Sequence, residues 1–152
     1  VSGTTVTFTF PGSGASGTVA DNTIVTDSSG YAETAIPVAN TTAGSYLVTV
    51  SATGIAPVTF SMTNTPGPAK NVTLVSGDNQ AALPGVDYTN ALVTKVTDQY
   101  GNVVEGATVT YTFPGSGATG TPSGTPVISP VSAQVIIGQR SRHRSTEDTP
   151  AD

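Results

Sequence analysis

Alternating apolar and polar residues mark the strands that this chain is expected to form. Val6, Phe8 and Phe10 recur every second residue between threonines, which places all three side chains on one face of a strand. The same period of two runs through residues 46–52 and 58–62. Similar runs predict further strands at 23–26, 32–37, 71–76, 90–97 and 108–113. The pattern therefore predicts an all-β protein.

Turn residues separate the predicted strands. Residues 27–30 and 53–57 each lie between two strands, and residues 98–102 form a hairpin turn in which Gly101 supplies a positive φ. Residues 66–69 contain two prolines and show no alternation, which is typical of a short, stiff linker between domains.

One segment of 13 residues occurs twice. Residues 6–18 read Val-Thr-Phe-Thr-Phe-Pro-Gly-Ser-Gly-Ala-Ser-Gly-Thr, and residues 109–121 differ only by Tyr111 and Thr119 in place of Phe8 and Ser16. The copies begin 103 residues apart. Short solenoid repeats have periods of about 20–50 residues, whereas an immunoglobulin-like sandwich occupies about 100. The spacing therefore indicates that the repeating unit is a whole domain.

The composition supports strands and narrows the classes of function. Charged residues make up only 10% of the chain, and threonine, serine, glycine and asparagine take their place. Without cysteine, no disulfide can form. A net charge of −5 gives no basis for binding nucleic acid, and no stretch is long enough to cross a membrane as a helix. We therefore expect no nucleic-acid partner and no membrane insertion.

Residues 122–152 depart from the pattern. If the repeat continued, a counterpart of residues 19–26 would follow Thr121, but the chain continues Pro-Ser-Gly-Thr-Pro-Val. All three arginines and the only histidine lie in this stretch. We expect an irregular tail that is disordered or not native to the repeat, such as a frameshifted end or a cloning junction. A reading frame that continues into a further domain after Asp152 would contradict this.

Three motifs resemble one known family. Residues 97–111 contain Asp-Gln-Tyr-Gly-Asn-Val-Val-Glu-Gly, residues 26–32 contain Thr-Asp-Ser-Ser-Gly-Tyr-Ala, and residues 42–50 contain Thr-Ala-Gly-Ser-Tyr-Leu-Val-Thr-Val. They resemble the motifs of bacterial immunoglobulin-like group 1 domains, the invasin and intimin type, with Val103 where that family has proline. The resemblance covers residues 1–121. It implies immunoglobulin-like β-sandwiches with Greek-key connections in a large bacterial adhesin or secreted surface protein.

The order of these motifs implies parts of two tandem repeats. In the family the Gly-Asn motif comes before the other two, whereas here it follows them. Residues 1–65 thus resemble the later strands of one repeat, residues 66–69 the linker, and residues 70–121 the early strands of the next repeat. The four-residue linker spans at most about 14 Å, less than the length of a sandwich, so one half cannot easily fold back onto the other. We expect a marginally stable fragment whose sheet edges pair with another copy.

The candidate chemical groups favour structural roles. Asp98 and Glu105 could form an acid pair, and the carboxylates of Asp21, Asp27 and Asp78 could bind calcium. A simpler explanation is that Asp98 caps its turn with its side chain and that the other carboxylates are solvated. His143 lies among arginines in the tail, where we expect no role. We assign no catalytic, cofactor-binding or metal-binding residue.

The remaining candidates also have simpler explanations. The glycine-rich residues 11–14 and 114–117 lack the lysine of a phosphate loop and are expected to be sandwich loops. The other candidates are Lys70 and Lys95 for isopeptide bonds, Asn40 and Asn71 for glycosylation, and Tyr46, Tyr88, Tyr100 and Tyr111 for stacking on a sugar. Tyr46 and Tyr111 lie on apolar faces and are expected in the core. Tyr100, at a hairpin tip, is the best exposed candidate.

The sequence therefore predicts a structural spacer without enzyme activity. Its partners would be neighbouring immunoglobulin-like repeats of the same chain, with a host-cell or matrix protein or glycan bound through other domains. The location implied is the bacterial cell surface or the extracellular medium. The alternative is a carbohydrate- or protein-binding immunoglobulin-like module of a secreted enzyme or adhesin.

Overall fold

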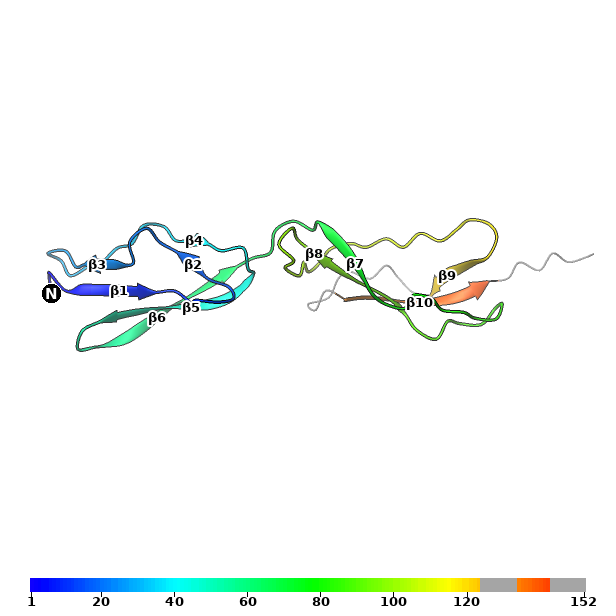
Figure 1. Cartoon of the computed structure of the whole chain (residues 1–152), viewed down its shortest axis with the longest axis horizontal. Helices are drawn as coiled ribbons and strands as arrows, with labels where there is room; N and C mark the ends of the chain where they lie inside the picture. Colours follow the sequence, from blue (N-terminus) through cyan, green and yellow to red (C-terminus); the bar gives the residue numbers. More distant parts are fainter. Residues whose placement is uncertain (124–133, 143–152) are drawn as a thin grey trace, which may run out of the picture. The chain divides into compact units, whose positions relative to one another are not determined.

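The regular secondary structure of the chain is entirely β. The computed structural model describes residues 1–123 and 134–142, and within these ranges every paired strand is antiparallel (Figure 1). The all-β prediction is thus confirmed, and the sheets are consistent with a β-sandwich class. The chain divides into unit 1, Val1–Gly67, and unit 2, Pro68–Asp152. The division falls inside the proline-containing residues 66–69.

Unit 1 is built on one four-stranded sheet. Its strands are β1 (Thr5–Thr9), β3 (Thr23–Val25), β5 (Gly44–Ala52) and β6 (Ile55–Asn64), in the order β3-β1-β5-β6. Phe8 stands opposite Val50, and Val48 opposite Phe60. Directly opposed residues point to the same side of a sheet, so the alternation of each strand combines into one apolar face.

This apolar face forms the core of unit 1. Phe8, Tyr46 and Val48 are buried, and these six side chains pack around them: Val6, Phe10, Ala15, Ile24, Val50 and Met62. The other side of the sheet is lined by threonines such as Thr49, which stands between Thr9 and Thr59. The alternation therefore separates an apolar face from an outer face rich in hydroxyls, on which Val25 and Leu47 are exposed apolar exceptions.

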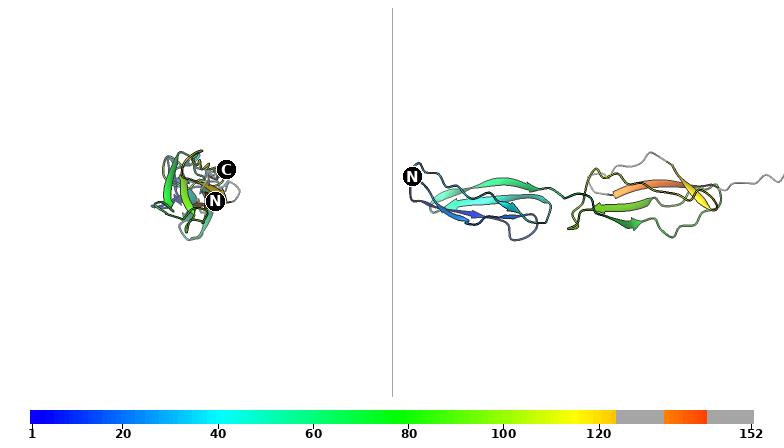
Figure 2. Two further views of the ribbon diagram at one scale, coloured as in Figure 1. Left: turned by 90° about the vertical axis from the view of Figure 1, so that its right-hand side faces the viewer. Right: turned by 90° about the horizontal axis from the view of Figure 1, so that it is seen from above.

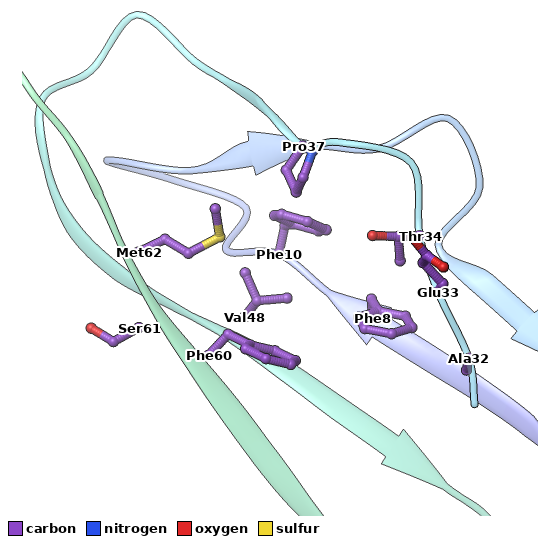
Figure 3. Close-up of a pocket in the computed structure, with 10 residues that line it drawn as sticks. All are labelled: Phe8, Phe10, Ala32, Glu33, Thr34, Pro37, Val48, Phe60, Ser61 and Met62. Carbon is purple, nitrogen blue, oxygen red and sulfur yellow. The ribbon is translucent and has the colours of Figure 1, made fainter. Parts of the chain in front are cut away.

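The stretch predicted as a strand at 32–37 forms none. The chain is paired only at β4 (Val38–Ala39), which joins β2 (Gly17–Thr18) in a two-stranded sheet. Residues 32–37 lie over the apolar face of the larger sheet, with Thr34 and Pro37 turned toward it (Figure 3). A segment that lies across a face has no neighbouring strand edge to pair with, and Pro37 has no N–H to donate.

Unit 2 also contains a four-stranded sheet. Its strands are β7 (Asn71–Ser76), β8 (Leu92–Thr97), β9 (Thr119–Ser123) and β10 (Gln134–Arg142), in the order β7-β8-β10-β9. Figure 2 shows β10 beside both β8 and β9. Val72 stands opposite Val96 and Leu74 opposite Thr94. Val93 and Val96 are the buried aliphatic side chains of β8.

In the second copy of the repeated segment, residues 108–113 form no strand, contrary to the prediction, although the end of the copy, from Thr119, lies in β9. In unit 1, β1 pairs with β3 on one side and β5 on the other. In unit 2, residues 107–110 instead line a groove over β7 and β8, and the Tyr111 hydroxyl lies 2.8 Å from the Thr94 hydroxyl. Strand formation needs partners as well as alternation, and within residues 1–123 and 134–142 no strand pairs with residues 108–113 as β3 and β5 pair with β1.

Part of the stretch expected to be irregular forms a strand. The expectation of an irregular tail over 122–152 is corrected for β10, which pairs with β8 through residues 134–137 and with β9 through residues 138–142. Its run Val135-Ile136-Ile137 is β-branched, a composition that favours strands. Residues 124–133 and 143–152 lie outside the described residues, and the native or foreign origin of the tail stays a prediction.

Candidate functional site

Unit 1 has an apolar groove on its surface. It has a volume of about 370 Å³ and lies between the apolar face of the sheet and residues 32–37 (Figure 3). Phe8, Phe10, Val48, Phe60 and Met62 line it from the sheet. Glu33 brings the one carboxylate to its rim. The groove can therefore accept apolar side chains.

A second groove lies over the end of the same face near the β5–β6 turn. It has a volume of about 330 Å³. Val6, Val50 and Val58 line it from the sheet, together with Ile55, the first residue of β6. Residues 32–37 therefore cover only the middle of the apolar face, and apolar surface remains open along β6.

A buried asparagine joins three segments at one end of unit 1. The Asn64 side-chain amide donates to Ser16 O at 2.8 Å, to Asn40 Oδ1 at 3.0 Å and to Thr42 O at 3.1 Å. Asn40 in turn donates from Nδ2 to Gly14 O at 2.8 Å. Both polar atoms of Asn40 are thus used inside the protein, so its sequon serves the fold rather than presenting a free amide for glycosylation.

Two aspartates cap turns of the same geometry. Asp27 Oδ1 accepts from the N–H groups of Ser29 and Tyr31 at 2.8 and 2.9 Å. Asp98 Oδ1 accepts from those of Tyr100 and Asn102 at the same two distances. The fourth residue is a glycine with positive φ in both turns, 88° at Gly30 and 86° at Gly101.

The capping role expected for Asp98 is confirmed by these contacts. Asp98 is only 1% exposed, and its second oxygen accepts from the Asn102 side-chain amide at 2.9 Å. Asp27, with the same turn contacts, is exposed. The sequence does not distinguish the two, because burial comes from the surrounding chain. The matching signature Thr-Asp-x-x-Gly at 26–30 and 97–101 could have revealed that the turns are alike.

The two glycine-rich loops also match each other. The Ser16 hydroxyl donates to Pro11 O at 2.7 Å, and the Thr119 hydroxyl donates to Pro114 O at 2.8 Å. Gly14 and Gly117 have positive φ values of 72° and 78°. The loop geometry is therefore encoded locally, since it persists where the preceding strand does not.

The other acidic candidates do not come together. Asp21, Asp78 and Glu105 are all exposed, and Asp78 accepts from Asn79 next to it in sequence. Over residues 1–123 and 134–142, no three histidine, aspartate or glutamate side chains gather closely enough to hold a metal ion. His143 lies outside the described residues.

Two tyrosines stand out on the surface. Tyr31 is 74% exposed and Tyr100 is 58% exposed, each within or beside one of the matching turns. Tyr46 is in the core, whereas Tyr88 and Tyr111 are half-buried. Tyr100 was expected on the surface from its place in a hairpin turn. Tyr31 was not, because it stands just after its turn signature, whereas Tyr100 stands within its own.

The lysine and second sequon candidates lie in the sheet of unit 2. Lys70 is exposed at the start of β7, and Lys95 is half-buried within β8. Asn71 is exposed and donates from its side-chain amide to Asp98 O at 3.1 Å. These contacts position β7 against the Asp98 turn.

Comparison with protein-family models, with curated proteins and with solved structures finds no match to this chain. Among the described residues, no helix is long and apolar enough to span a membrane.

Proposed function

We propose that this chain is a segment of a structural spacer, built from tandem immunoglobulin-like repeats of a large bacterial cell-surface or secreted adhesin-like protein. The observation that carries the proposal is the reuse of local structure. Two capped turns and two glycine-rich loops recur with the same hydrogen bonds in different units. The loops are separated by the full 103-residue period of the sequence.

The surface chemistry also suits a spacer. The outer face of the sheet in unit 1 carries threonine and serine hydroxyls, and the units meet at a segment with two prolines. Proline fixes φ and stiffens a linker, while short hydroxyl side chains keep the surface wettable without charge. Such units can be added to lengthen a chain without changing their chemistry.

The spacer function can be tested by counting periods. We expect that chains carrying one, two and four 103-residue periods, stretched in single-molecule force measurements, gain a constant contour length and one further unfolding event per added period. Contour length that does not grow in equal steps would contradict a spacer made of independent units.

The exposed tyrosines give the alternative function its support. Tyr31 and Tyr100 lie at equivalent turns, and an exposed ring can stack on a sugar. A carbohydrate-binding module would give saturable binding on a glycan array, and the double variant Tyr31→Ala, Tyr100→Ala would abolish that binding. Binding to the array that is lost in the double variant would favour a carbohydrate-binding module over a spacer for this segment. If the segment is a spacer, no binding that depends on these tyrosines is expected.

A further inference from the structure

The apolar face of unit 1 stays open along its edge strand. β6 is the last strand of the order β3-β1-β5-β6, and its sequence contains no charged residue. Val58 and Phe60 point to the apolar face, yet they are 62% and 58% exposed. Edge strands are usually protected by charge, by proline or by a covering segment. β6 contains Pro57, which removes one N–H from its edge but covers neither Val58 nor Phe60. This uncovered strip is therefore a surface suited to a further layer of apolar side chains.

Unit 2 presents an apolar stripe of matching character. Val72 and Leu74 alternate along β7 and are 60% and 62% exposed. They share their face with the buried Val96. Residues 107–110 cover this face near Lys70, and the Tyr111 hydroxyl reaches Thr94, the residue opposite Leu74, but Val72 and Leu74 themselves stay exposed. The β7–β8 sheet thus has an apolar face that is open on one side.

The register of the repeated segment indicates that these two surfaces belong together. Residues 109–121 repeat residues 6–18, so β7 and β8 hold the positions that precede this segment in one period. Strands β5 and β6 hold positions that follow it. One whole period would contain both sets of strands, and two sheets that each have one apolar face are stabilised by packing those faces together.

The charges of the two surfaces are also compatible. Unit 1 contains three acidic side chains and neither lysine nor arginine, and one of its acids, Glu33, lines the groove beside Phe60. Lys70 alternates with Val72 and Leu74 at the start of β7, so it lies on the face that would approach this groove. Opposite charges at the rim favour this docking over the pairing of two acidic unit 1 faces.

We infer that copies of this chain associate head to tail, with the β7–β8 face of unit 2 in one copy covering the open β5–β6 face of unit 1 in another. The interface is heterologous, because two different surfaces meet. Each copy retains one free surface of each kind, so association continues beyond the dimer. The occupant of the groove in unit 1 is the Val72 and Leu74 stripe of a second copy. This inference rests on the repeat register and the exposed faces, and it does not depend on the spacer function.

Sedimentation velocity of the full chain tests the association. We expect the weight-average mass to rise from monomer through dimer and higher species between low micromolar and millimolar concentration. Phe60→Lys and Leu74→Lys each place a charge on one of the two surfaces, and each is expected to raise the concentration needed for association at least about tenfold. Both side chains are more than half exposed, so neither variant loses a buried core residue.

Matched controls separate the docking surfaces from a general effect of charge. Leu47 is 54% exposed and follows Tyr46 in β5, so it lies on the opposite side of the sheet from Phe60. Thr73 is exposed on the opposite side of β7 from Leu74. Leu47→Lys and Thr73→Lys are expected to associate as the parent chain does. Far-UV circular dichroism of all four variants reports whether each retains its strands.

A mixing experiment decides between head-to-tail and symmetric association. Phe60→Lys keeps an intact unit 2 surface, and Leu74→Lys keeps an intact unit 1 surface. At a concentration where the parent chain associates but each variant alone is still monomeric, we expect an equimolar mixture to form a dimer and nothing larger. If Leu74→Lys alone dimerised, the interface would join two unit 1 faces and the inference would be overturned.

Two other outcomes would also overturn it. A parent chain that stays monomeric at every concentration would show that the two faces do not meet between copies. If Phe60→Lys or Leu74→Lys lost its strands, Val58→Lys or Val72→Lys would replace it in the mixing experiment, since Val58 and Val72 lie on the same two faces and are 62% and 60% exposed. Failure of that mixture to form dimers would reject the proposed surfaces while leaving the contour-length test of the spacer function unaffected.

Discussion

The turns of this protein are determined by single side chains nearby in sequence, whereas its strands depend on partners elsewhere in the chain. The same aspartate contacts form at Asp27 and Asp98, although one side chain is exposed and the other is buried. An aspartate that accepts two N–H groups of its own turn needs no distant partner. Burial determines how much each cap contributes to the free energy of unfolding. At an exposed turn water can bond the N–H groups in place of the carboxylate, whereas at a buried turn it cannot.

Asp98→Ala should destabilise unit 2 by about 2–4 kcal/mol, because it removes the buried carboxylate that accepts from Tyr100 N–H, from Asn102 N–H and from the Asn102 side-chain amide. Asp27→Ala should destabilise unit 1 by less than half as much. Amide hydrogen exchange measured by NMR at Tyr100 and Asn102, and at Ser29 and Tyr31, gives the two local opening energies. Equal losses at both turns would show that burial does not control the contribution of the cap.

Asn64→Ala should destabilise unit 1 by about 1–3 kcal/mol, because Ser16 O, Asn40 Oδ1 and Thr42 O all lose a donor at once. Ser45→Ala is the control, since it removes an exposed hydroxyl contact with Thr63 at 2.8 Å in the same pair of strands. It should change the free energy of unfolding by no more than about 0.5 kcal/mol. Urea denaturation followed by circular dichroism measures both. An Asn64→Ala variant as stable as Ser45→Ala would contradict a central role for this amide.

Whole elements depend on their neighbours, and the two copies of the repeated segment demonstrate it. Residues 6–9 lie in strand β1, whereas the nearly identical residues 109–113 form no strand. Alternation predicted the side-chain faces correctly in both β1 and β6, since it needs only the geometry of an extended chain. It could not predict pairing at 32–37 or 109–113, because pairing depends on which backbone edges the rest of the chain brings alongside.

The candidate site was harder to predict from sequence. The apolar residues of β1, β5 and β6 could be assigned to a face, but Phe60 and Val58 could not be recognised as exposed. Their exposure follows from the path of residues 32–37, which cover the middle of the face and leave β6 open. The strand β10 was missed because the proline- and glycine-rich residues before it do not continue the repeat, although Val135-Ile136-Ile137 favours a strand.

The connection between β7 and β8 gives an element-scale prediction. Gly77 has a φ of 94°, and a Cβ there would overlap the Ala91 carbonyl and lie 2.9 Å from Leu92 Cα. Gly77→Ala should therefore prevent the close approach of the two strand ends and lower the melting temperature of unit 2 by at least about 5 °C. Gly85→Ala is the control, with a similar φ of 79° but open space around the new methyl group. It should have a smaller effect in the same thermal melt, and equal effects would show that φ alone accounts for the loss.

At the scale of the whole molecule, the chain contains two β units whose apolar faces are each partly open. The repeat register explains this if residues 69–108 and residues 6–67 are complementary parts of one period. On that account the stability of unit 1 is limited by the exposed strip along β6. Covering the strip with β7 and β8 in one chain would bury Phe60 and Val58 without requiring a second copy.

The most direct test is the unfolding of a rearranged chain, in which residues 69–108 are followed by residues 6–67. We expect a monomer with a single sharp urea transition. The midpoint does not change with protein concentration, and it lies at a higher urea concentration than the midpoint of the parent chain. The parent chain, in the same measurement, should unfold at a midpoint that rises with concentration. Two results would contradict the claim that the two units are parts of one repeating domain. One is a rearranged chain that unfolds at the parent midpoint or below it. The other is a parent chain whose transition is sharp and independent of concentration.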